Sequence, residues 1–453
     1  MSLLMDDYLE CLSRGYGHSD KSICHDCVSN YALKSYIIEK GEMKICSYCG
    51  RRRKSILLED LMAPVMDGIR FMYSLAVEEL PVDEGEFVGC TYSTEDIFSE
   101  SIADEIGASC EEIISDMVSL IGDETWCDAN PFDVSEDEAE FNEWQRFCKL
   151  VKEKMRYVFF EAKDESESSS SPMEILNYIA ACTQKIGLVT TINKNTKMYR
   201  CRMSKDEKYY SSLADFCPPP LGKAYAGRMN AQGIPVLYLT LDQKTALDEV
   251  NSSERQFASV ASYRVEDSFP VLDLTKLESI KVPSIFDAEG RTKISTIRFL
   301  KKFNEQISQK ATNEQIDYVP TQIVTEYFRF LNKGGSSQYQ GIMYNSAQNR
   351  GGKCLVLFLS REDVLKRKHG IHIIPNQTMY FSKKYEWTSE EEKANLLYVT
   401  RIIKETGAKT LSEISEATGM SKAATARLIK KLQDQGILNK KLSEIQPPLT
   451  KVI

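Results

Sequence analysis

The sequence predicts a multidomain chain of the α+β class, and three observations lead to this prediction. The length of 453 residues suggests about three domains, at roughly one to two hundred residues each. A stretch with helical periodicity is followed by a stretch of short strand-like runs, and a charged serine tract separates the two. Hydrophobic residues make up 42% of the chain, which is enough for real cores and excludes global disorder.

Composition and periodicity divide the chain into five parts. The first boundary is the tract Asp164–Ser171, which has nothing to pack in a core. The expected parts are a zinc knuckle at 1–62, an acidic helical region at 63–163, a serine-rich linker at 164–172, a mixed α and β domain at 173–385, and a winged helix-turn-helix at 386–453.

Two Cys-x-x-Cys pairs near the N-terminus predict a structural zinc site. A spacer of 18 residues separates the pairs. Four thiolates on two tight turns can surround one tetrahedral zinc ion and leave no open position. His18 and His25 are nearby substitutes, so a set of four cysteines is the favoured one. The predicted ligands are Cys24, Cys27, Cys46 and Cys49.

The next region is strongly acidic and has the periodicity of helices. Residues 78–147 contain 22 Asp and Glu and one basic residue, a net charge of −21 that leaves +12 on the rest of the chain. Apolar residues recur at intervals of three and four among these acids, which is typical of amphipathic helices. We expect a helical bundle with a solvated acidic surface. The periodic residues are Met66, Ile69, Met72 and Leu75, then Ile113, Met117 and Leu120.

We expect neither a membrane-spanning segment nor an export signal. No apolar run approaches the roughly 18 residues that a spanning helix needs. Asp6, Asp7 and Glu10 stand where a signal peptide carries lysine or arginine. The nine cysteines outside the two pairs are scattered singly, which is cytosolic usage and not a disulfide framework. We therefore expect a cytoplasmic protein without a membrane partner.

The central domain contains two arginines on one face of an expected strand. Alternation over Lys197–Met203 puts Arg200 and Arg202 on one face and Tyr199, Cys201 and Met203 on the other. Each guanidinium offers a planar set of hydrogen-bond donors, so two arginines on one face suit a diphosphate. The alternative interpretation is that this face of the strand is exposed to solvent. The expected strands are 198–203, 236–239, 271–274, 342–344 and 354–359.

Two further clusters follow in the same domain. Gly227–Pro235 leads into the strand Val236–Thr240, and Asp242 then caps a helix that carries Glu249. Tyr344–Ser346 closes a later strand and precedes a glycine turn. No Gly-x-Gly-x-x-Gly follows a strand and no Walker lysine is present, so a nucleotide would not be held on a Rossmann or P-loop frame.

The order of these motifs resembles the RES domain. Tyr-Arg-x-Arg, Gly-Arg-x-Asn-x-x-Gly-x-Pro-x-Leu-Tyr-Leu, Thr-Ala-x-x-Glu and Tyr-x-Ser occur in turn over roughly residues 195–365. The zinc knuckle and acidic region look like the HEPN-like module that accompanies some RES domains. HEPN ribonucleases use a histidine that follows an arginine, but the helical region contains no histidine, which argues against an RNase role there.

The resemblance implies a core like that of ADP-ribosyltransferases and degradation of NAD, by phosphorolysis in characterised toxins. One of the two strand arginines, with Arg228, would hold the NAD diphosphate. Tyr238 would stack beside the nicotinamide, Glu249 would act at the reacting ribose, and Ser346 would complete the site. The implied cofactor-binding residues are Arg200, Arg202, Arg228 and Asn230, and the implied catalytic residues are Glu249, Tyr238 and Ser346.

The C-terminal tail resembles a winged helix-turn-helix. Residues 410–416 and 422–433 are expected helices on either side of a glycine turn, and a short strand follows. Nine basic and four acidic residues occur between Val399 and Lys441, which favours contact with DNA phosphates; a protein-docking module is the alternative. The expected DNA contacts are Ser421, Lys422, Thr425 and Arg427 on the second helix and Lys440 and Lys441 on the wing.

These observations together predict an NAD-consuming effector of toxin or defence type. It would be an NAD phosphorylase or an NAD glycohydrolase, with NAD and phosphate as small-molecule partners and zinc as a structural ion. An antitoxin or regulatory protein and duplex DNA are the expected macromolecular partners. The alternatives are an ADP-ribosyltransferase that modifies a macromolecule, and a DNA-binding regulator in which the RES-like domain senses a nucleotide.

Overall fold

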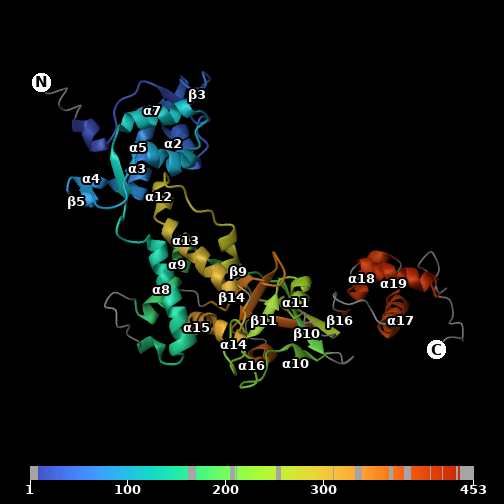
Figure 1. Ribbon diagram of the computed structural model, residues 1–453. Coiled ribbons are helices and arrows are strands. Elements are labelled where there is room, and N and C mark those ends of the chain that lie inside the picture. The colour runs from blue at the N-terminus through green and yellow to red at the C-terminus, as the bar shows by residue number, and fades with distance from the viewer. Residues whose placement is uncertain are drawn as a thin grey trace. The chain divides into compact units, whose positions relative to one another are not determined.

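The computed structural model describes residues 9–161, 170–204, 210, 212–250, 257–309, 311–331, 339–366, 371–381, 389–408, 410–420, 422–434 and 437–438. The chain divides into two compact units, each made of several segments (Figure 1). The first unit consists of Met1–Phe147, Ala162–Gly187 and Leu277–Phe303, and the second of Cys148–Glu161, Leu188–Lys276 and Asn304–Ile453. Among the described residues, no helix has the length and apolar character needed to cross a membrane.

The first unit begins with a small antiparallel sheet that carries the cysteine pairs. Its strands are β1 (Ser22–Cys24), β3 (Arg52–Leu57) and β2 (Glu42–Ile45), in that order. α2 (Tyr31–Lys40) follows the first cysteine pair. Asn30 begins this helix, because its side chain accepts hydrogen bonds from the backbone N–H groups of Ala32 and Leu33.

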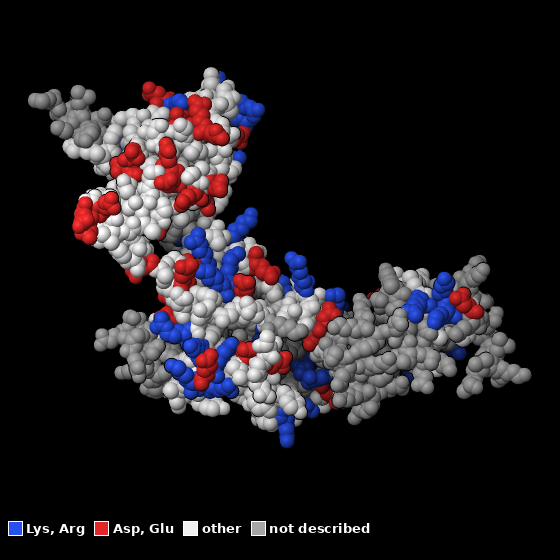
Figure 2. Space-filling model, viewed as in Figure 1, with Lys and Arg blue, Asp and Glu red and all other residues white. Residues whose placement is uncertain are grey.

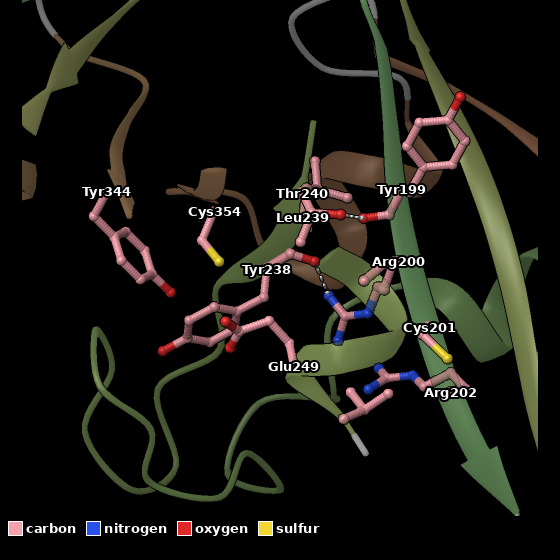
Figure 3. Close-up of a pocket in the computed structure, with 12 residues that line it drawn as sticks. Tyr199, Arg200, Cys201, Arg202, Tyr238, Leu239, Thr240, Glu249, Tyr344 and Cys354 are labelled. Carbon is pink, nitrogen blue, oxygen red and sulfur yellow. Dashed lines mark hydrogen bonds between the residues drawn. The ribbon is translucent and has the colours of Figure 1, made fainter. Parts of the chain in front are cut away.

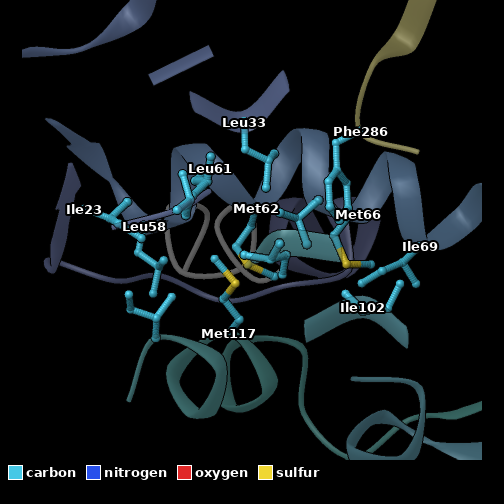
Figure 4. Close-up of a cluster of buried hydrophobic side chains, with 14 of the residues drawn as sticks. Ile23, Leu33, Leu58, Leu61, Met62, Met66, Ile69, Ile102, Met117 and Phe286 are labelled. Carbon is cyan, nitrogen blue, oxygen red and sulfur yellow. The ribbon is translucent and has the colours of Figure 1, made fainter. Parts of the chain in front are cut away.

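The apolar periodicity of the acidic region places one face of each long helix in a common core. α3 (Leu58–Met72) buries Leu61, Met62 and Met66, and α7 (Glu111–Ile121) buries Met117 on the facing side (Figure 4). Each such side chain contributes about 1.5–3 kcal/mol when it is fully buried. Many acidic side chains lie on the face of the unit that Figure 2 shows, although Asp137 is buried.

The acidic region is not purely helical, so the expected helical bundle is only partly correct. α3 ends at Met72, and Tyr73 adopts an extended conformation that opens β4 (Tyr73–Leu75). Leu75, expected on a helix, therefore lies on a strand, because β4 pairs with β8 (Thr125–Asp128), which also pairs with β7 (Tyr92–Ser93). The shorter elements here are α4 (Ala76–Glu79), β5 (Val82–Asp83), β6 (Glu86–Phe87), α5 (Thr94–Ile97), the π-helix Phe98–Ile102 and α6 (Ala103–Ile106).

A segment from the middle of the chain completes the core of the first unit. Ile285, Phe286 and Ile294 belong to the same hydrophobic cluster as α3 and α7. Phe286 lies directly on Gly68 of α3, where any Cβ would collide with the aromatic ring. Asn30 Nδ2 also donates a hydrogen bond to Ser284 Oγ at 2.9 Å. Residues far apart in sequence therefore form one folding unit here.

Three helices of the first unit meet through an aromatic cluster. They are α8 (Glu136–Lys149), α9 (Pro172–Ile186) and the N-terminal part of α13 (Ile294–Ser308). The ring of Trp144 lies 4.9 Å from that of Phe303, and the rings of Tyr178 and Phe299 are 5.1 Å apart. α12 (Ala288–Arg291) precedes α13 and is capped by the side chain of Asp287.

An eight-stranded mixed sheet forms the centre of the second unit, in the order β16-β12-β10-β11-β15-β14-β13-β9. All neighbours are antiparallel except β13 and β14. The five strands expected from sequence are confirmed as β10, β11, β13, β14 and β15. The bounds are β9 (Val189–Ile192), β10 (Lys197–Ser204), β11 (Leu237–Thr240), β12 (Phe257–Val265), β13 (Phe269–Asp273), β14 (Gly341–Asn345), β15 (Lys353–Leu357) and β16 (Ile371–Phe381).

Two central strands of the sheet, β10 and β11, pair with each other at only one position. β10 pairs with β12 along its whole length, but it pairs with β11 only at Tyr199 and Thr240. α11 (Gln243–Glu249) follows β11 and covers the face that carries Tyr199 and Cys201. The other helical elements of this unit are the π-helix Leu150–Lys154, α10 (Leu213–Phe216), α14 (Glu314–Asp317), α15 (Val319–Glu326), the π-helix Tyr327–Leu331 and α16 (Arg361–Leu365).

The tail forms three helices with a small core of their own (Figure 1). They are α17 (Ser389–Thr406), α18 (Leu411–Thr418) and α19 (Lys422–Asp434), which agrees with the expected helix-turn-helix. Thr410 and Glu413 form a capping box at the start of α18. Ile414, Leu428 and Leu432 are buried between the helices.

Candidate functional site

Four cysteine sulfurs converge in the first unit. The Sγ atom of Cys24 lies 3.6 Å from those of Cys27 and Cys49, and the Sγ atoms of Cys27 and Cys46 are also 3.6 Å apart. All four sulfurs lie within 4.8 Å of one another. Zn–S bonds of about 2.3 Å in a tetrahedron place the sulfurs about 3.8 Å apart, so the cluster fits zinc. The four predicted ligands are thus brought together and could bind this ion.

The surroundings of the cysteines also suit a metal. Tight turns aim the sulfurs inward, because Cys27 N–H donates to Cys24 O at 3.0 Å and Gly50 N–H donates to Cys46 O at 2.9 Å. Burial raises the pKa of Cys24 to about 11 and also raises that of Cys27, because desolvation disfavours the thiolate. A bound cation would compensate the charge of the thiolates. The structure brings neither His18 nor His25 into this cluster.

A side chain between two of the cysteines connects the cluster to a helix. Tyr48 donates its hydroxyl proton to Asp116 on α7 at 2.7 Å. Lys21 Nζ donates to the same carboxylate at 2.7 Å and lies over the tyrosine ring. The geometry of the second cysteine turn is therefore coupled to the helical core.

A cavity of about 250 Å³ lies in the second unit, where β10 and β11 separate (Figure 3). Residues of β10 and β11 form its walls, α11 contributes Ala246 and Glu249, Val250 follows that helix, and Tyr344 and Cys354 come from β14 and β15. The lining residues are Tyr199, Arg200, Cys201, Arg202, Tyr238, Leu239, Thr240, Ala246, Glu249, Val250, Tyr344 and Cys354.

Arg200 is a buried cation in this cavity. Its side chain is 7% exposed, so the alternative of a solvated strand face is wrong for this residue. Nη1 donates to the backbone oxygen of Tyr238 at 3.3 Å, and no described residue forms an ion pair with Arg200. Burial, together with Arg202, lowers the pKa of Arg200 to about 10, and the group therefore stays charged at neutral pH. A buried, unpaired cation favours an anionic ligand.

Arg202 differs from its neighbour because its guanidinium is already engaged. Nε donates to the carbonyl oxygen of Asp215 at 3.1 Å, and Nη2 donates to that of Cys217 at 3.1 Å. These bonds hold the C-terminal end of α10 against β10. The two arginines were equivalent candidates in the sequence, but the structure places Arg200 better for a ligand and gives Arg202 a role in the loop.

Glu249 and Ser346 meet beside the cavity. Glu249 is the last residue of α11, and Ser346 directly follows β14. Ser346 Oγ donates a hydrogen bond to Glu249 Oε1. Burial and the nearby carboxylate of Glu249 raise the pKa of Cys354 above its usual range. Two of the three residues that the resemblance implied as catalytic are thus brought together at one end of the cavity.

Arg228 lies outside the residues that line the cavity. Its guanidinium lies 5.1 Å from the ring centre of Tyr318, and Nη1 donates to the backbone oxygen of Ile307. Arg228 and Glu249 both act electrostatically on the hydroxyl of Tyr344, which places this arginine near the same site. Thr321 on α15 fixes the backbone of Arg228, because its hydroxyl donates to the Arg228 oxygen at 2.6 Å.

The side chains of Asn230 and Tyr238 are hydrogen-bonded to each other. Tyr238 donates its hydroxyl proton to Asn230 Oδ1 at 2.8 Å, and its oxygen accepts from the N–H of Met229 at 2.9 Å. The amide nitrogen of Asn230 donates to backbone oxygens within its own loop, including that of Tyr225 at 2.9 Å. Asn230 is 4% exposed and does not line the cavity, and its side chain stabilises its own loop. The ring of Tyr238 does line the cavity.

Two residues of this site were not singled out as functional from the sequence. Tyr344 is buried, and Figure 3 shows its hydroxyl pointing towards Tyr238 and Glu249. Desolvation is the largest cause that raises the pKa of Tyr344. Tyr318 offers its ring to Arg228. The motif Tyr-x-Ser contains Tyr344 and could have identified it as a candidate site residue. Alternation along one strand does not show which strand lies next to the cavity.

The predicted DNA contacts fall into three groups. Arg427 is exposed on α19. Thr425 is 0% exposed, so its placement at the DNA surface is wrong: it lies one turn before Leu428 and Ile429 and shares their buried face. The side chain of Lys422 and the whole of Ser421, Lys440 and Lys441 lie outside the described residues.

Comparison with known families identifies three domains in the chain. Residues 39–165 match HEPN/RES N-terminal domain 1, residues 197–377 match the RES domain, and residues 398–441 match the IclR helix-turn-helix domain. The RES match contains the whole lining of the cavity, and the first match contains Cys46 and Cys49. A RES domain implies an NAD-related function of the toxin type in general, and an IclR-type helix-turn-helix suggests DNA binding.

Comparison with curated proteins and with solved structures gave no match.

Proposed function

We propose that this chain, which carries a RES domain behind a HEPN/RES N-terminal domain, is an NAD-consuming effector of toxin or defence type. NAD would bind where β10 and β11 separate, on a core like that of ADP-ribosyltransferases. One observation carries the proposal: the carboxylate of Glu249, which accepts a hydrogen bond from Ser346, lies at a cavity that is also lined by Arg200, a buried cation with no ion pair among the described residues. A cation for a diphosphate and an anion for a ribosyl cation are the two charges that NAD cleavage requires.

The roles of the residues follow from the charges of NAD. Arg200 would bind the diphosphate, with Arg228 as a second cation near the site. The ring of Tyr238 would lie against the nicotinamide, because an aromatic face attracts a cationic pyridinium ring. Glu249 would face the carbon of the ribose that carries the nicotinamide. Ser346 would orient Glu249 through the hydrogen bond that it donates.

The reaction breaks the bond between the ribose C1′ and the nicotinamide nitrogen. The electron pair of this bond neutralises the cationic pyridinium, so the leaving group needs no general acid. Positive charge develops on the ribosyl centre, and the carboxylate of Glu249 would stabilise it. An oxygen of phosphate or of water then bonds to C1′, and water must lose a proton in this step. The enzyme is accordingly an NAD phosphorylase or an NAD glycohydrolase.

The mass of the product distinguishes these reactions. Purified protein is incubated with NAD, with and without phosphate, and the products are identified by mass spectrometry. ADP-ribose 1″-phosphate formed only with phosphate indicates phosphorolysis, and ADP-ribose in both samples indicates hydrolysis. A macromolecule that gains the mass of one ADP-ribosyl group would contradict the proposal and support the ADP-ribosyltransferase alternative. NAD that binds but stays intact would favour the nucleotide-sensing regulator.

The two flanking domains would serve the same effector in different ways. We propose that the four cysteines hold one structural zinc ion, and that an antitoxin or regulatory protein controls the enzyme.

The C-terminal helices would bind duplex DNA through its phosphates, so the affinity for DNA should fall steeply as the salt concentration rises. Lys422→Ala combined with Arg427→Ala should weaken binding in a mobility-shift assay. Equal binding by a chain that ends at Ser389 would contradict the role of the tail.

A further inference from the structure

The loop between β14 and β15 is attached to α11 by one side-chain amide. Asn349 Nδ2 lies 2.7 Å from the hydroxyl oxygen of Thr245, which is 0% exposed on α11. Gly352 closes the loop against the same threonine so tightly that any Cβ would collide with its hydroxyl. The backbone also closes on itself, since Ser346 N–H donates to Gly352 O at 2.8 Å. The position of Asn349 therefore fixes the loop relative to α11.

The neighbouring groups determine the direction of this hydrogen bond. The carboxylate of Asp242, the cap of α11, accepts from the hydroxyl of Thr245 at 2.6 Å and from its backbone N–H at 2.8 Å. The hydroxyl proton of Thr245 is thus already donated, and its oxygen is left as an acceptor for Asn349 Nδ2. Lys244 Nζ, which can only donate, lies 2.6 Å from Asn349 Oδ1. Both ends of the amide are therefore assigned.

The same loop determines what Ser346 can do. The backbone N–H groups of Gln348 and Asn349 donate to Ser346 Oγ at 3.2 Å and 2.9 Å. Both lone pairs of the hydroxyl oxygen are then occupied, and its one proton points to Glu249. Ser346 is a donor to the carboxylate in this arrangement. It has no lone pair left with which to attack a substrate as a nucleophile.

We infer that Asn349 is a positioning residue for NAD cleavage: through Thr245 it holds the loop so that Ser346 orients the carboxylate of Glu249. This inference rests on the proposed function. Asn349 does not line the cavity, and it acts only through the backbone N–H that it places on Ser346. Small errors in the position of a reacting group reduce the rate more than they reduce binding. Loss of the hydrogen bond between Asn349 and Thr245 should therefore lower kcat and leave the KM for NAD nearly unchanged.

The test removes the hydrogen bond from each of its two ends in the full-length chain. Asn349→Ala and Thr245→Val should each lower kcat about 10- to 100-fold. The double variant should lose about as much as the more impaired single variant, because both changes delete the bond between Asn349 and Thr245. Thr245→Ser keeps the hydroxyl and should retain most of the turnover. Arg350→Ala, an exposed neighbour in the same loop, is the matched control and should behave as wild type.

The outcomes separate this inference from the proposed function. If wild type consumes NAD but Asn349→Ala has the same kcat, the positioning role is wrong and the proposed function stands. If kcat is unchanged while the melting temperature falls, Asn349 only stabilises the loop. Losses that add in the double variant would show that the two residues act separately. A wild type that consumes no NAD would overturn the proposed function, and the positioning role with it.

Discussion

Arg200 and Arg202 have the same sequence environment but different surroundings in the folded chain. They project from the same face of β10, two residues apart. Arg202 donates to two backbone oxygens at the C-terminal end of α10, whereas Arg200 has one long hydrogen bond and no ion pair among the described residues. A guanidinium that is not engaged in the fold is the one available for a diphosphate.

Variants of the two arginines should fail in different ways. Arg200→Lys keeps the charge but loses the planar fork of donors, so the KM for NAD should rise at least several-fold with little change in stability. Arg202→Ala removes the two hydrogen bonds that Arg202 donates to the carbonyl oxygens of Asp215 and Cys217 and should cost about 1–3 kcal/mol of unfolding free energy. Steady-state kinetics and thermal unfolding measure the two effects. The reverse pattern would exchange the roles of the two residues.

The charge of Glu249 should matter for turnover and not for binding. It faces a positive charge that develops only as the nicotinamide leaves, whereas Arg228 would bind the diphosphate throughout the reaction. Glu249→Gln should lose about 3 kcal/mol of transition-state stabilisation, on the scale of one oxyanion-hole donor, and kcat should fall about 100-fold or more. Arg228→Ala should chiefly raise KM. Near wild-type turnover of Glu249→Gln would show that this carboxylate is only a surface charge.

At the scale of one element, the zinc knuckle is small and depends on its ion. The three strands β1, β2 and β3 bury few residues, so a bound metal would supply much of their folding energy. The turn between Cys46 and Cys49 also carries Tyr48, which bonds to Asp116 on α7. Loss of the ion should thus disturb the helical core as well as the knuckle.

Metal analysis and limited proteolysis test this dependence. Native protein should contain about one zinc ion per chain, which the double variant Cys46→Ser with Cys49→Ser should lose. That variant should be cleaved faster in its N-terminal region. Cys90→Ser, which changes an exposed cysteine outside the cluster, is the matched control and should keep its zinc. Native protein without zinc would refute the metal site.

At the scale of the whole molecule, one segment inside the RES match belongs to the first unit. Residues 277–303 lie within the matched range 197–377, yet Ile285, Phe286 and Ile294 are buried in the cluster formed with α3 and α7. The RES domain is therefore not separable from the N-terminal region by cutting the chain at the serine tract. The contact of Phe286 with Gly68 marks where the two stretches of sequence meet.

A fragment of residues 170–453 should aggregate for this reason. It leaves Ile285, Phe286 and Ile294 without their partners, and an exposed apolar patch of this kind promotes association. Ile285→Ser with Phe286→Ser should improve the solubility of the fragment. In the full-length chain Phe286→Ala should cost about 3–5 kcal/mol of unfolding free energy. A fragment that is monomeric by gel filtration without these changes would contradict the shared core.

Local patterns were sufficient to locate many of the elements. Short strand-like runs between glycine turns identified β10, β11, β13, β14 and β15, and alternation over Lys197–Met203 assigned residues to the two faces of β10. Helical periodicity identified α3 and α7, although Leu75 was assigned to a helix and lies on β4. Thr425 was placed at the DNA surface, but it shares the buried face of α19. Spacing along one element does not show what packs against each of its faces.

The sequence by itself determined the cysteine pairs, the positions of five strands of the central sheet, the cap of α11 and the order of the motifs. Only the tertiary structure decided that Glu249 and Ser346, 97 residues apart, are hydrogen-bonded, and that Arg200 is the unpaired arginine. The reason is physical. Caps, turns and periodicity depend on a few neighbouring residues, whereas the strand order β10-β11-β15-β14 is fixed by long-range pairing and burial, which bring α11 and the loop after β14 to one end of the cavity.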